Sequence, residues 1–340
     1  MDEATAHPPR AVNLSAFLDR AGWGDATHQP MSADASFRRY IRLRHGTRRA
    51  LVMDAPPPHE RVGPFIQVDR HLQNLGFSVP TLLAEDAENG FLLLEDFGDA
   101  TFTNLLAAGA DEENLYTLAT DTLVALHRSP SAIAPWLDPY DADTLYQEAA
   151  LLIDWFVPAH NLPLARPAQR DYEHIWRGLF ETVLSGPKTL VLRDFHVDNL
   201  MHLDDRNGIR ACGVLDFQDA LAGHPAYDLM SLLQDARRDV DATLQTALKT
   251  RYRQALNFSR DAWEEFDRAY RILAAQRHAK VIGIFTRLDR RDAKPVYLKH
   301  IDRLWRLFEH ALDHPMMADL KTWINHHIPP DKRHPPEARS

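Results

Sequence analysis

The chain has 340 residues, of which 45% are hydrophobic and 26% are charged. This is the balance of a globular protein with two domains or one bilobal fold, and it excludes a disordered, collagenous or fibrous chain. Lys and Arg number 39 against 48 for Asp and Glu, so the net charge is −9, and such an acidic surface repels the phosphates of a nucleic acid.

Short strands are predicted in the first hundred residues. Residues 37–43 alternate apolar and polar side chains, and residues 50–53 follow across a short turn, which predicts a hairpin. Apolar side chains in residues 65–75 recur at helical spacing. Residues 90–94 predict a buried strand, and the segment 95–99 ends its apolar run abruptly.

Helices are predicted to dominate from residue 100 onward. A leucine-rich stripe marks residues 115–126, with Asp111 as a candidate N-cap. Further helical patterns cover 143–157, 168–185, 228–236, 241–257, 261–289 and 296–314. Among them, residues 190–217 have the character of a strand pair.

These elements predict an α+β chain with two lobes. A small sheet-rich N-terminal lobe, 1–97, precedes a larger helical lobe, 98–328, and the two join at about 95–99. The interface between two such lobes is a common place for a ligand cleft. Residues 329–340 are rich in proline and charge, and we expect them to form a flexible tail.

The strand pair contains the dipeptide Asn207-Gly208, a strong short signal for a tight hairpin turn. A two-residue turn there places Asn199 opposite Asp216 at the open end of the hairpin, with Cβ atoms about 5 Å apart. An amide oxygen and a carboxylate so placed can share one hard cation. Mg²⁺ suits them, because it takes few protein oxygens beside waters and phosphates.

Asp194 lies five residues before Asn199, on the loop that enters this hairpin. Phosphoryl transfer requires an Asp that accepts a hydroxyl proton, and an Asn and a second Asp that hold metal on the nucleotide phosphates. Each part also has an ordinary explanation, with Asn199 as a turn residue and Asp216 as the end of a strand. The predicted hairpin places these two face to face and therefore favours the catalytic interpretation.

Residues 192–199 read Leu-Arg-Asp-Phe-His-Val-Asp-Asn, and an Asp-Phe dipeptide follows at 216. They resemble the aminoglycoside phosphotransferase and choline-kinase-like families, relatives of the protein kinases, with His-Gly-Asp or His-Arg-Asp before x4-Asn and an Asp-Phe metal motif. Leu192 stands where the family has His, a departure that bears on the rigidity of the loop. The resemblance implies a protein-kinase-like bilobal fold, ATP and Mg²⁺ as cofactors, Asp194 as the catalytic base, and Asn199 and Asp216 as metal ligands.

Further blocks resemble the bacterial sugar-kinase branch of these families. They lie at 34–40, 53–57, 90–96, 213–220, 223–229 and 280–288. In that branch the nearest activity is phosphorylation of the anomeric hydroxyl of N-acetylmuramate and N-acetylglucosamine, which serves peptidoglycan recycling. The resemblance therefore implies an amino-sugar 1-kinase. It also implies that Asp228, which is expected to cap a helix, braces the catalytic loop.

The resemblance places the adenine of ATP at the segment that follows the buried strand. Glu95 and Phe97 would offer it a backbone carbonyl and a backbone amide. Ser36 lies at the position of the family's phosphate loop and could donate to a phosphate oxygen. An ordinary turn explains Asp34 and Ser36 nearly as well.

Related kinases carry a lysine on the third strand that pairs with the nucleotide phosphates. Here the corresponding position looks like Met53, whose thioether bears no charge. We hypothesise that Arg38 or Arg39 supplies the positive charge instead. The alternative is that both are solvated strand residues.

Candidate sugar-binding residues lie mainly in the helical lobe. Trp155 and Phe156 could form an apolar face against a sugar ring, and Asp154 could bind its hydroxyls, although a core aromatic pair with a solvated acid is the stronger explanation. Asp219 follows the metal motif closely and could face the same cleft. Arg287 could meet the lactyl carboxylate of a muramic acid, because Arg suits bidentate carboxylates.

Two other functions stay open. One is a kinase of another small hydroxyl compound on the same fold, such as an aminoglycoside, choline or homoserine. The other is a catalytically inactive nucleotide-binding protein, for which Met53 and Leu192 are grounds. The expected partners are the sugar substrate and ATP, with no nucleic acid and no membrane, and we expect a monomer.

We also expect a cytoplasmic protein. No signal-peptide pattern is visible, and no apolar run approaches the ~20 residues that span a bilayer. Cys212 is the single cysteine, which excludes an intramolecular disulfide and fits a reducing compartment.

Overall fold

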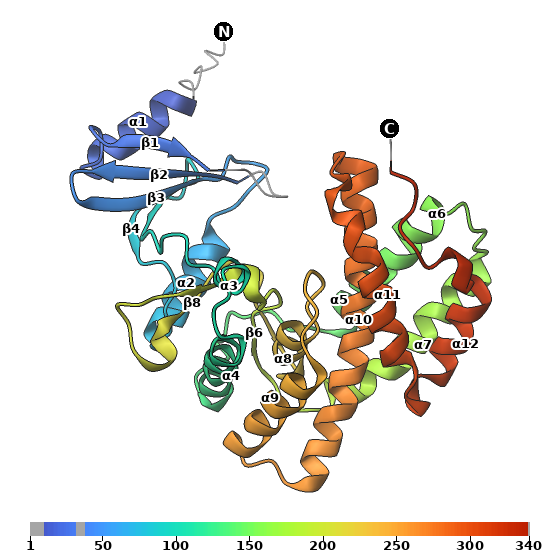
Figure 1. Cartoon of the computed structure of the whole chain (residues 1–340). Coiled ribbons are helices and arrows are strands. Elements are labelled where there is room, and N and C mark those ends of the chain that lie inside the picture. The colour runs from blue at the N-terminus through green and yellow to red at the C-terminus, as the bar shows by residue number, and fades with distance from the viewer. Residues whose placement is uncertain (1–9, 32–37, 339–340) are drawn as a thin grey trace. The chain divides into compact units, whose positions relative to one another are not determined.

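The computed structural model describes residues 10–31 and 38–338, and the chain divides into two compact units (Figure 1). The first unit contains residues 1–108 and 199–219, and the second contains residues 109–198 and 220–340. The boundary therefore differs from the predicted one near residue 97. A short helix, α3 (Phe102–Ala107), and the strands β7 (Leu200–His202) and β8 (Cys212–Val214) belong to the first unit.

A five-stranded antiparallel sheet in the order β1-β2-β3-β5-β4 forms the first unit's framework. The strands are β1 (Thr27–Pro30), β2 (Arg39–His45), β3 (Arg48–Asp54), β4 (Leu82–Asp86) and β5 (Phe91–Leu94). The predicted hairpin is confirmed as β2 and β3, whose turn uses Gly46 at φ +61°, a conformation that glycine adopts without steric cost. The predicted buried strand is confirmed as β5.

Helices α1 and α2 bury apolar side chains in the first unit. Helix α1 (Arg10–Arg20) places Phe17 in a buried apolar cluster with Val52 and Phe91 of the sheet. Helix α2 (Gly63–Asn74) confirms the helix predicted over 65–75, and the ring of its Phe65 lies 4.9 Å from that of Phe217. Because Phe217 directly follows Asp216, this contact fixes the chain at the predicted metal motif.

The second unit is mainly helical. Its helices are α4 (Glu112–Arg128), α5 (Ala142–Leu151), α6 (Val157–Ala159), α7 (Arg166–Leu184), α8 (Ala226–Leu233), α9 (Ala242–Ala255), α10 (Arg260–Asp292), α11 (Ile301–Leu312) and α12 (Ala318–His327). The strands β6 (Thr189–Val191) and β9 (Leu221–Gly223) pair antiparallel. The predicted helical stretches are confirmed, and the predicted N-cap Asp111 accepts a hydrogen bond from the N–H of Asn114 at 3.1 Å.

Helix α10 is the central element of this unit and packs against α5, α8 and α11 (Figure 1). Gly283 of α10 lies against the backbone of Leu151, so closely that a Cβ atom there would come within 2.3 Å of it. The next residues, Leu152–Phe156 (η1), form a π-helical turn, a feature that often marks functional sites.

The tail predicted to be flexible is fixed in its first part. Residues Pro330–Lys332 (η6) form a 3₁₀ turn. The side chain of Arg333 donates to the Ile328 carbonyl at 2.9 Å and to Glu309 at 2.7 Å. Within residues 10–31 and 38–338, no helix is both long and apolar enough to cross a membrane.

Candidate active site

The β7–β8 hairpin differs in register from the predicted one. Leu200 faces Val214, and the connection between the strands contains a 3₁₀ turn, Gly208–Ala211 (η3). The predicted two-residue turn is therefore wrong. The direct pairing of Asn199 with Asp216 is also wrong, because the observed register is shifted by one residue.

Asn199 and Asp216 are nevertheless neighbours at the end of this hairpin. The N–H of Leu215 donates to the carbonyl of Asn199 at 2.9 Å. Asp216 follows with φ +56°, a left-handed conformation that turns the chain away from the strand direction. Its side chain is 49% exposed. An amide and an accessible carboxylate on adjoining backbones fit Mg²⁺, which completes its shell with water and phosphate oxygens.

Gln218 and Arg38 are polar neighbours of the Asp216 carboxylate. The side-chain amide of Gln218 donates to Asp216 at 2.8 Å and also reaches Asp219 at 3.3 Å. Nη1 of Arg38 lies 4.0 Å from Asp216. The predicted site residues Asp216, Asp219 and Arg38 are therefore brought together in the first unit.

Arg38 and Arg39 lie in different surroundings. The guanidinium of Arg38 is mostly buried and donates to Glu60 at 3.1 Å, beside the carboxylate of Asp216. Arg39 is exposed at the start of β2. Of the two candidates for the missing positive charge, the structure thus favours Arg38.

The position of the family's third-strand lysine is apolar in this chain. Met53 is buried, and the hydroxyl of Tyr40 on the paired strand donates to its sulfur at 3.3 Å. This side chain carries no charge that could pair with a phosphate. The predicted phosphate-loop residue Ser36 lies outside the described residues.

Arg42 holds the segment after β5, a role that the sequence patterns did not indicate. Its buried guanidinium donates to Asp96 at 3.0 Å, to Asp99 at 2.9 Å and to the carbonyl of Gly98 at 3.0 Å. These three bonds from one side chain fix the backbone of residues 95–99.

The backbone of this segment leaves groups available to a ligand. The N–H of Glu95 donates to the Thr81 carbonyl at 2.9 Å, and the Glu95 carboxylate is held by Thr81 and Arg206. The hydrogen bonds of the described residues leave the Glu95 carbonyl and the Phe97 amide unused. These are the two groups predicted to read adenine.

The loop 192–194 belongs to the second unit and is braced from helix α8. The carboxylate of Asp228 accepts hydrogen bonds from the N–H of Leu192 at 2.7 Å and the N–H of Arg193 at 2.9 Å. Burial raises the pKa of Asp228 to about 7, while the two backbone donors act in the opposite direction. Asp228 lies inside α8 and not at its N-cap, so the predicted capping role is wrong. The predicted brace is confirmed.

Asp194 combines access to solvent with a cationic surrounding. Its carboxylate is 40% exposed, and Nη2 of Arg277 lies 3.8 Å from it. Burial works to raise the pKa of Asp194, but the nearby cations, Lys280 first and then Arg277, hold it below its ordinary value. The side chain is therefore an anion, which a group that accepts a proton must be.

Helices α10 and α5 contribute buried polar and charged side chains to which the sequence analysis assigned no role. Gln276, Arg277, His278 and Lys280 are buried on α10, and Glu148 is buried on α5. The sequence does show charged residues on the apolar face of a long helix, and such residues need partners when they are buried. The sequence did not reveal which partners those are.

Three of the predicted sugar-binding residues lie on two elements of the second unit that pack together, whereas Asp219 belongs to the first unit. Asp154 and Trp155 lie in the π-helical turn, which packs against α10, and α10 also carries Arg287. Phe156 is instead buried, with its ring 5.3 Å from that of Trp305, which agrees with the stronger of the two explanations offered for it, a core aromatic residue. Nε of Arg287 is buried without a hydrogen-bond partner among the described residues.

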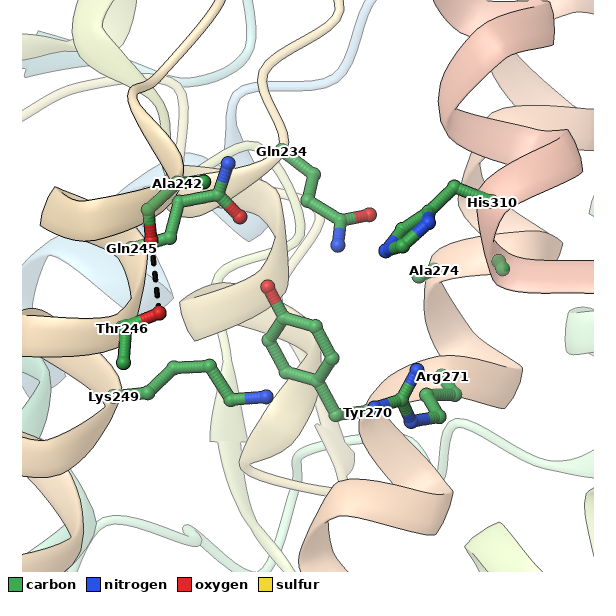
Figure 2. A pocket seen from close by; sticks show the side chains of 10 residues that line it. Gln234, Ala242, Gln245, Thr246, Lys249, Tyr270, Arg271, Ala274 and His310 are labelled. Carbon is green, nitrogen blue, oxygen red and sulfur yellow. Dashed lines mark hydrogen bonds between the residues drawn. The ribbon is translucent and has the colours of Figure 1, made fainter. Parts of the chain in front are cut away.

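A separate cavity of about 200 Å³ lies in the second unit (Figure 2). It is lined by Gln234, Ala242, Gln245, Thr246, Lys249, Tyr270, Arg271, Ala274, His310 and Ala311. Lys249 and Arg271 both pair with Asp267, at 2.5 and 2.8 Å. Because its cations are matched by an acid and none of the predicted site residues lines it, this cavity gives no support to a role in the reaction.

Residues 27–267 match the profile of a family described as the phosphotransferase enzyme family. The chain is 33% identical to an N-acetylmuramate/N-acetylglucosamine kinase from Caulobacter vibrioides, over 97% of this chain and 99% of that protein. It is 39% identical to a protein of the same name from Pseudomonas aeruginosa, over 88% of this chain and 89% of that protein.

Solved structures show the same fold at low sequence identity. A choline kinase from Streptococcus pneumoniae superposes with a TM-score of 0.59 at 10% identity, over 91% of this chain and 99% of that one. The ADP-bound aminoglycoside phosphotransferase APH(2'')-Ib gives 0.53 at 15% identity, over 86% and 94%. The predicted protein-kinase-like α+β fold is confirmed.

Proposed function

Since the chain belongs to the phosphotransferase enzyme family, we propose that it is an ATP-dependent kinase that phosphorylates the anomeric hydroxyl of N-acetylmuramate, N-acetylglucosamine or both. The observation that carries the proposal is the 33–39% identity with kinases of that name along most of the chain. It is supported by Asp194, Asn199 and Asp216, which are the three residue types that this chemistry requires.

Asp194 is the base in this proposal. The anomeric oxygen attacks the γ-phosphorus, the bond from that phosphorus to the bridging oxygen of ADP breaks, and Asp194 takes the hydroxyl proton. The cations around Asp194 keep it ionised, and the Asp228 brace fixes the backbone on which it sits. Catalysis then comes mainly from orientation and charge neutralisation, as in other phosphoryl transfers.

Asn199 and Asp216 would hold Mg²⁺ on the nucleotide phosphates, and the ion would neutralise the charge that develops on them. Arg38 lies 4.0 Å from Asp216 and would supply the fixed positive charge that Met53 does not. The carbonyl of Glu95 and the amide of Phe97 would bind adenine. This assignment locates each nucleotide contact in the first unit.

Arg287 supports an acidic sugar as acceptor. Its Nε is buried and has no hydrogen-bond partner in the part of the chain that the structure describes, and burial, followed by the nearby cation Arg291, lowers its pKa. A carboxylate ligand would satisfy such a guanidinium with two parallel bonds, whereas choline or an aminoglycoside would place a second cation beside it. Asp154 and Trp155, on the element packed against α10, would contact the sugar. Asp219 would add an acceptor beside Asp216.

The test is a screen of ATP consumption with N-acetylmuramate, N-acetylglucosamine, choline, homoserine and kanamycin, with Asp194→Asn as the control. We expect turnover with one or both amino sugars and loss of the reducing end of the sugar, because phosphate on the anomeric oxygen blocks ring opening. Turnover of choline or kanamycin alone, or a product that stays reducing, contradicts the proposal.

The second candidate function is that of a nucleotide-binding protein without activity. Buried Met53 and the loss of the loop histidine at Leu192 favour it. Thermal stabilisation by ATP with Mg²⁺, but no turnover of any acceptor in the screen, would support this candidate. We propose a cytoplasmic location for either candidate, because both would bind ATP.

A further inference from the structure

The carboxylate of Glu148 is the centre of a buried polar cluster in the second unit. Glu148 is 8% exposed. Lys280 lies 2.8 Å from it and Gln276 donates to it at 3.0 Å, and Arg193 and Tyr140 also donate to it. One carboxylate thus receives four donors, two of which are cations. The cations outweigh the cost of burial and hold the pKa of Glu148 at about 2.

Three of the four donors belong to helix α10 or are hydrogen-bonded to strand β9. Lys280 and Gln276 lie one turn apart on α10, and the amide of Gln276 also reaches the Leu145 carbonyl of α5 at 3.1 Å. The N–H of Tyr140 donates to the carbonyl of Ala222 in β9 at 2.9 Å. Helices α5 and α10 and strand β9 are therefore joined at Glu148.

The fourth donor, Arg193, belongs to the catalytic loop. Its backbone has φ +70°, a left-handed conformation that costs a residue with a Cβ about 1 kcal/mol. Two contacts oppose relaxation of this conformation. The Asp228 carboxylate holds the backbone N–H, and Glu148 holds the guanidinium. Because Asp194 is the next residue, any relaxation at Arg193 redirects the Asp194 side chain.

We infer that Glu148 positions the base Asp194 through Arg193, and that this ion pair does the work of the scaffold histidine that Leu192 replaces. Glu148 is a positioning residue in this inference and touches neither sugar nor nucleotide. The inference rests on the proposed function for the role of Asp194.

The alternative role for Glu148, direct binding of a sugar hydroxyl, is opposed by its hydrogen bonds. A carboxylate has about four sites for donors, and the four donors of the cluster already use them. The carboxylate is also buried, so a hydroxyl would have to displace one of these partners. The ion pair therefore acts on the loop and not on the acceptor.

The test uses Glu148→Gln and Arg193→Met, with Arg193→Lys as the conservative variant. We expect Glu148→Gln to lower kcat by about 100-fold, the loss that a misplaced catalytic group brings. The KM values for ATP and for the sugar should stay within roughly threefold, since no substrate contact is removed. Arg193→Lys should recover part of kcat, and the double variant Glu148→Gln with Arg193→Met should be little worse than either single one.

Asp267→Asn is the matched control, because Asp267 also holds a lysine and an arginine, Lys249 and Arg271, away from the loop. It should leave kcat and both KM values unchanged. A rise in the KM for sugar with unchanged kcat in Glu148→Gln would mean that Glu148 binds the acceptor, and the inference would be wrong.

A second measurement does not depend on which acceptor the enzyme uses. Amide hydrogen exchange in Leu192, Arg193 and Asp194 should be faster in Glu148→Gln than in wild type, while exchange in α10 stays close to wild type. Unchanged exchange in the loop overturns the inference even if the sugar-kinase activity is confirmed. Faster exchange in a protein that phosphorylates none of the tested sugars supports the loop brace and contradicts only the proposed function.

Discussion

Nη2 of Arg277 lies 3.8 Å from the carboxylate of Asp194, and the side chain of Arg277 is only 4% exposed. Nη1 of the same guanidinium is buried without a hydrogen-bond partner among the described residues. A buried cation with free bonding capacity beside a half-exposed carboxylate acts mainly through its charge. It favours the ionised form of Asp194, because an opposite charge at this distance lowers the pKa of a carboxyl.

Replacement of Arg277 should therefore change the pH dependence of the reaction. The cations hold the pKa of Asp194 below its ordinary value, so Arg277→Met should raise it and move the acidic limb of the kcat profile to higher pH. Arg277→Lys, which keeps the charge, should move the limb less. The check is kcat for the sugar from pH 4 to 8, and an acidic limb that stays in place in Arg277→Met contradicts the role of Arg277.

Replacement of Arg38 should weaken nucleotide binding. Arg38→Ala removes the charge next to Asp216, and we expect the KM for ATP to rise by at least about tenfold, the worth of one charge-assisted hydrogen bond. Arg39→Ala is the control, because Arg39 is exposed at the start of the same strand. An equal rise in the KM for ATP in the two variants, measured by steady-state kinetics, would contradict the assignment of the positive charge to Arg38.

Replacement of Asp216 should change the dependence on Mg²⁺. Asp216→Asn removes a charged ligand, so the Mg²⁺ concentration for half-maximal activity should rise and the maximal kcat should fall by at least about 100-fold. Asp204→Asn serves as the control, since Asp204 is a highly exposed acid of the same hairpin connection. A Mg²⁺ titration that is the same for wild type and Asp216→Asn would exclude Asp216 as a ligand.

Replacement of Asp69 should stabilise the first unit at neutral and basic pH. Asp69 of α2 is fully buried, Gln73 satisfies one of its oxygens at 2.8 Å, and the other has no partner among the described residues. Burial raises the pKa of Asp69 to about 7. Its contribution to stability is therefore fully present below the unfolded pKa of ~3.9 and is lost as the pH rises through about 7.

The Asp69→Asn variant has no ionisable group at this position, so its stability does not depend on pH through residue 69. Its free energy of unfolding relative to wild type should increase between about pH 4 and pH 7 and then level off, at a gain of about 4 kcal/mol, because each unit between the unfolded and folded pKa values is worth ~1.4 kcal/mol. Urea denaturation at a series of pH values measures this difference. A difference that does not vary with pH would show that Asp69 is not titrating in this range.

The sequence predicted elements whose signals are local. The β2–β3 hairpin follows from alternation around Gly46, and α4 follows from its leucine stripe and the Asp111 cap. Contacts between distant residues decided the parts that differed. The dipeptide Asn207-Gly208 favours a tight turn, but the hydroxyl of Ser78 donates to the carbonyl of Arg210 at 2.7 Å, and η3 forms there instead.

The candidate site divides in the same way. Asp194, Asn199 and Asp216 could be proposed from their spacing, because the motif lies within one short stretch of chain. The partners of that stretch could not. Glu148 precedes Arg193 by 45 residues and Lys280 follows it by 87, and only the packing of α5 against α10 brings the three together. Helical periodicity indicates that such residues are buried but does not say what they meet.

The left-handed backbone of Asp216 has a consequence for any selection of more thermostable variants of this protein. Glycine or asparagine would adopt φ +56° with less strain than aspartate, so a screen that rewards heat resistance alone should enrich those two residues at position 216. The selected variants would have a higher melting temperature and would transfer phosphate far more slowly than wild type. An activity assay at each round is needed to keep the aspartate in the population.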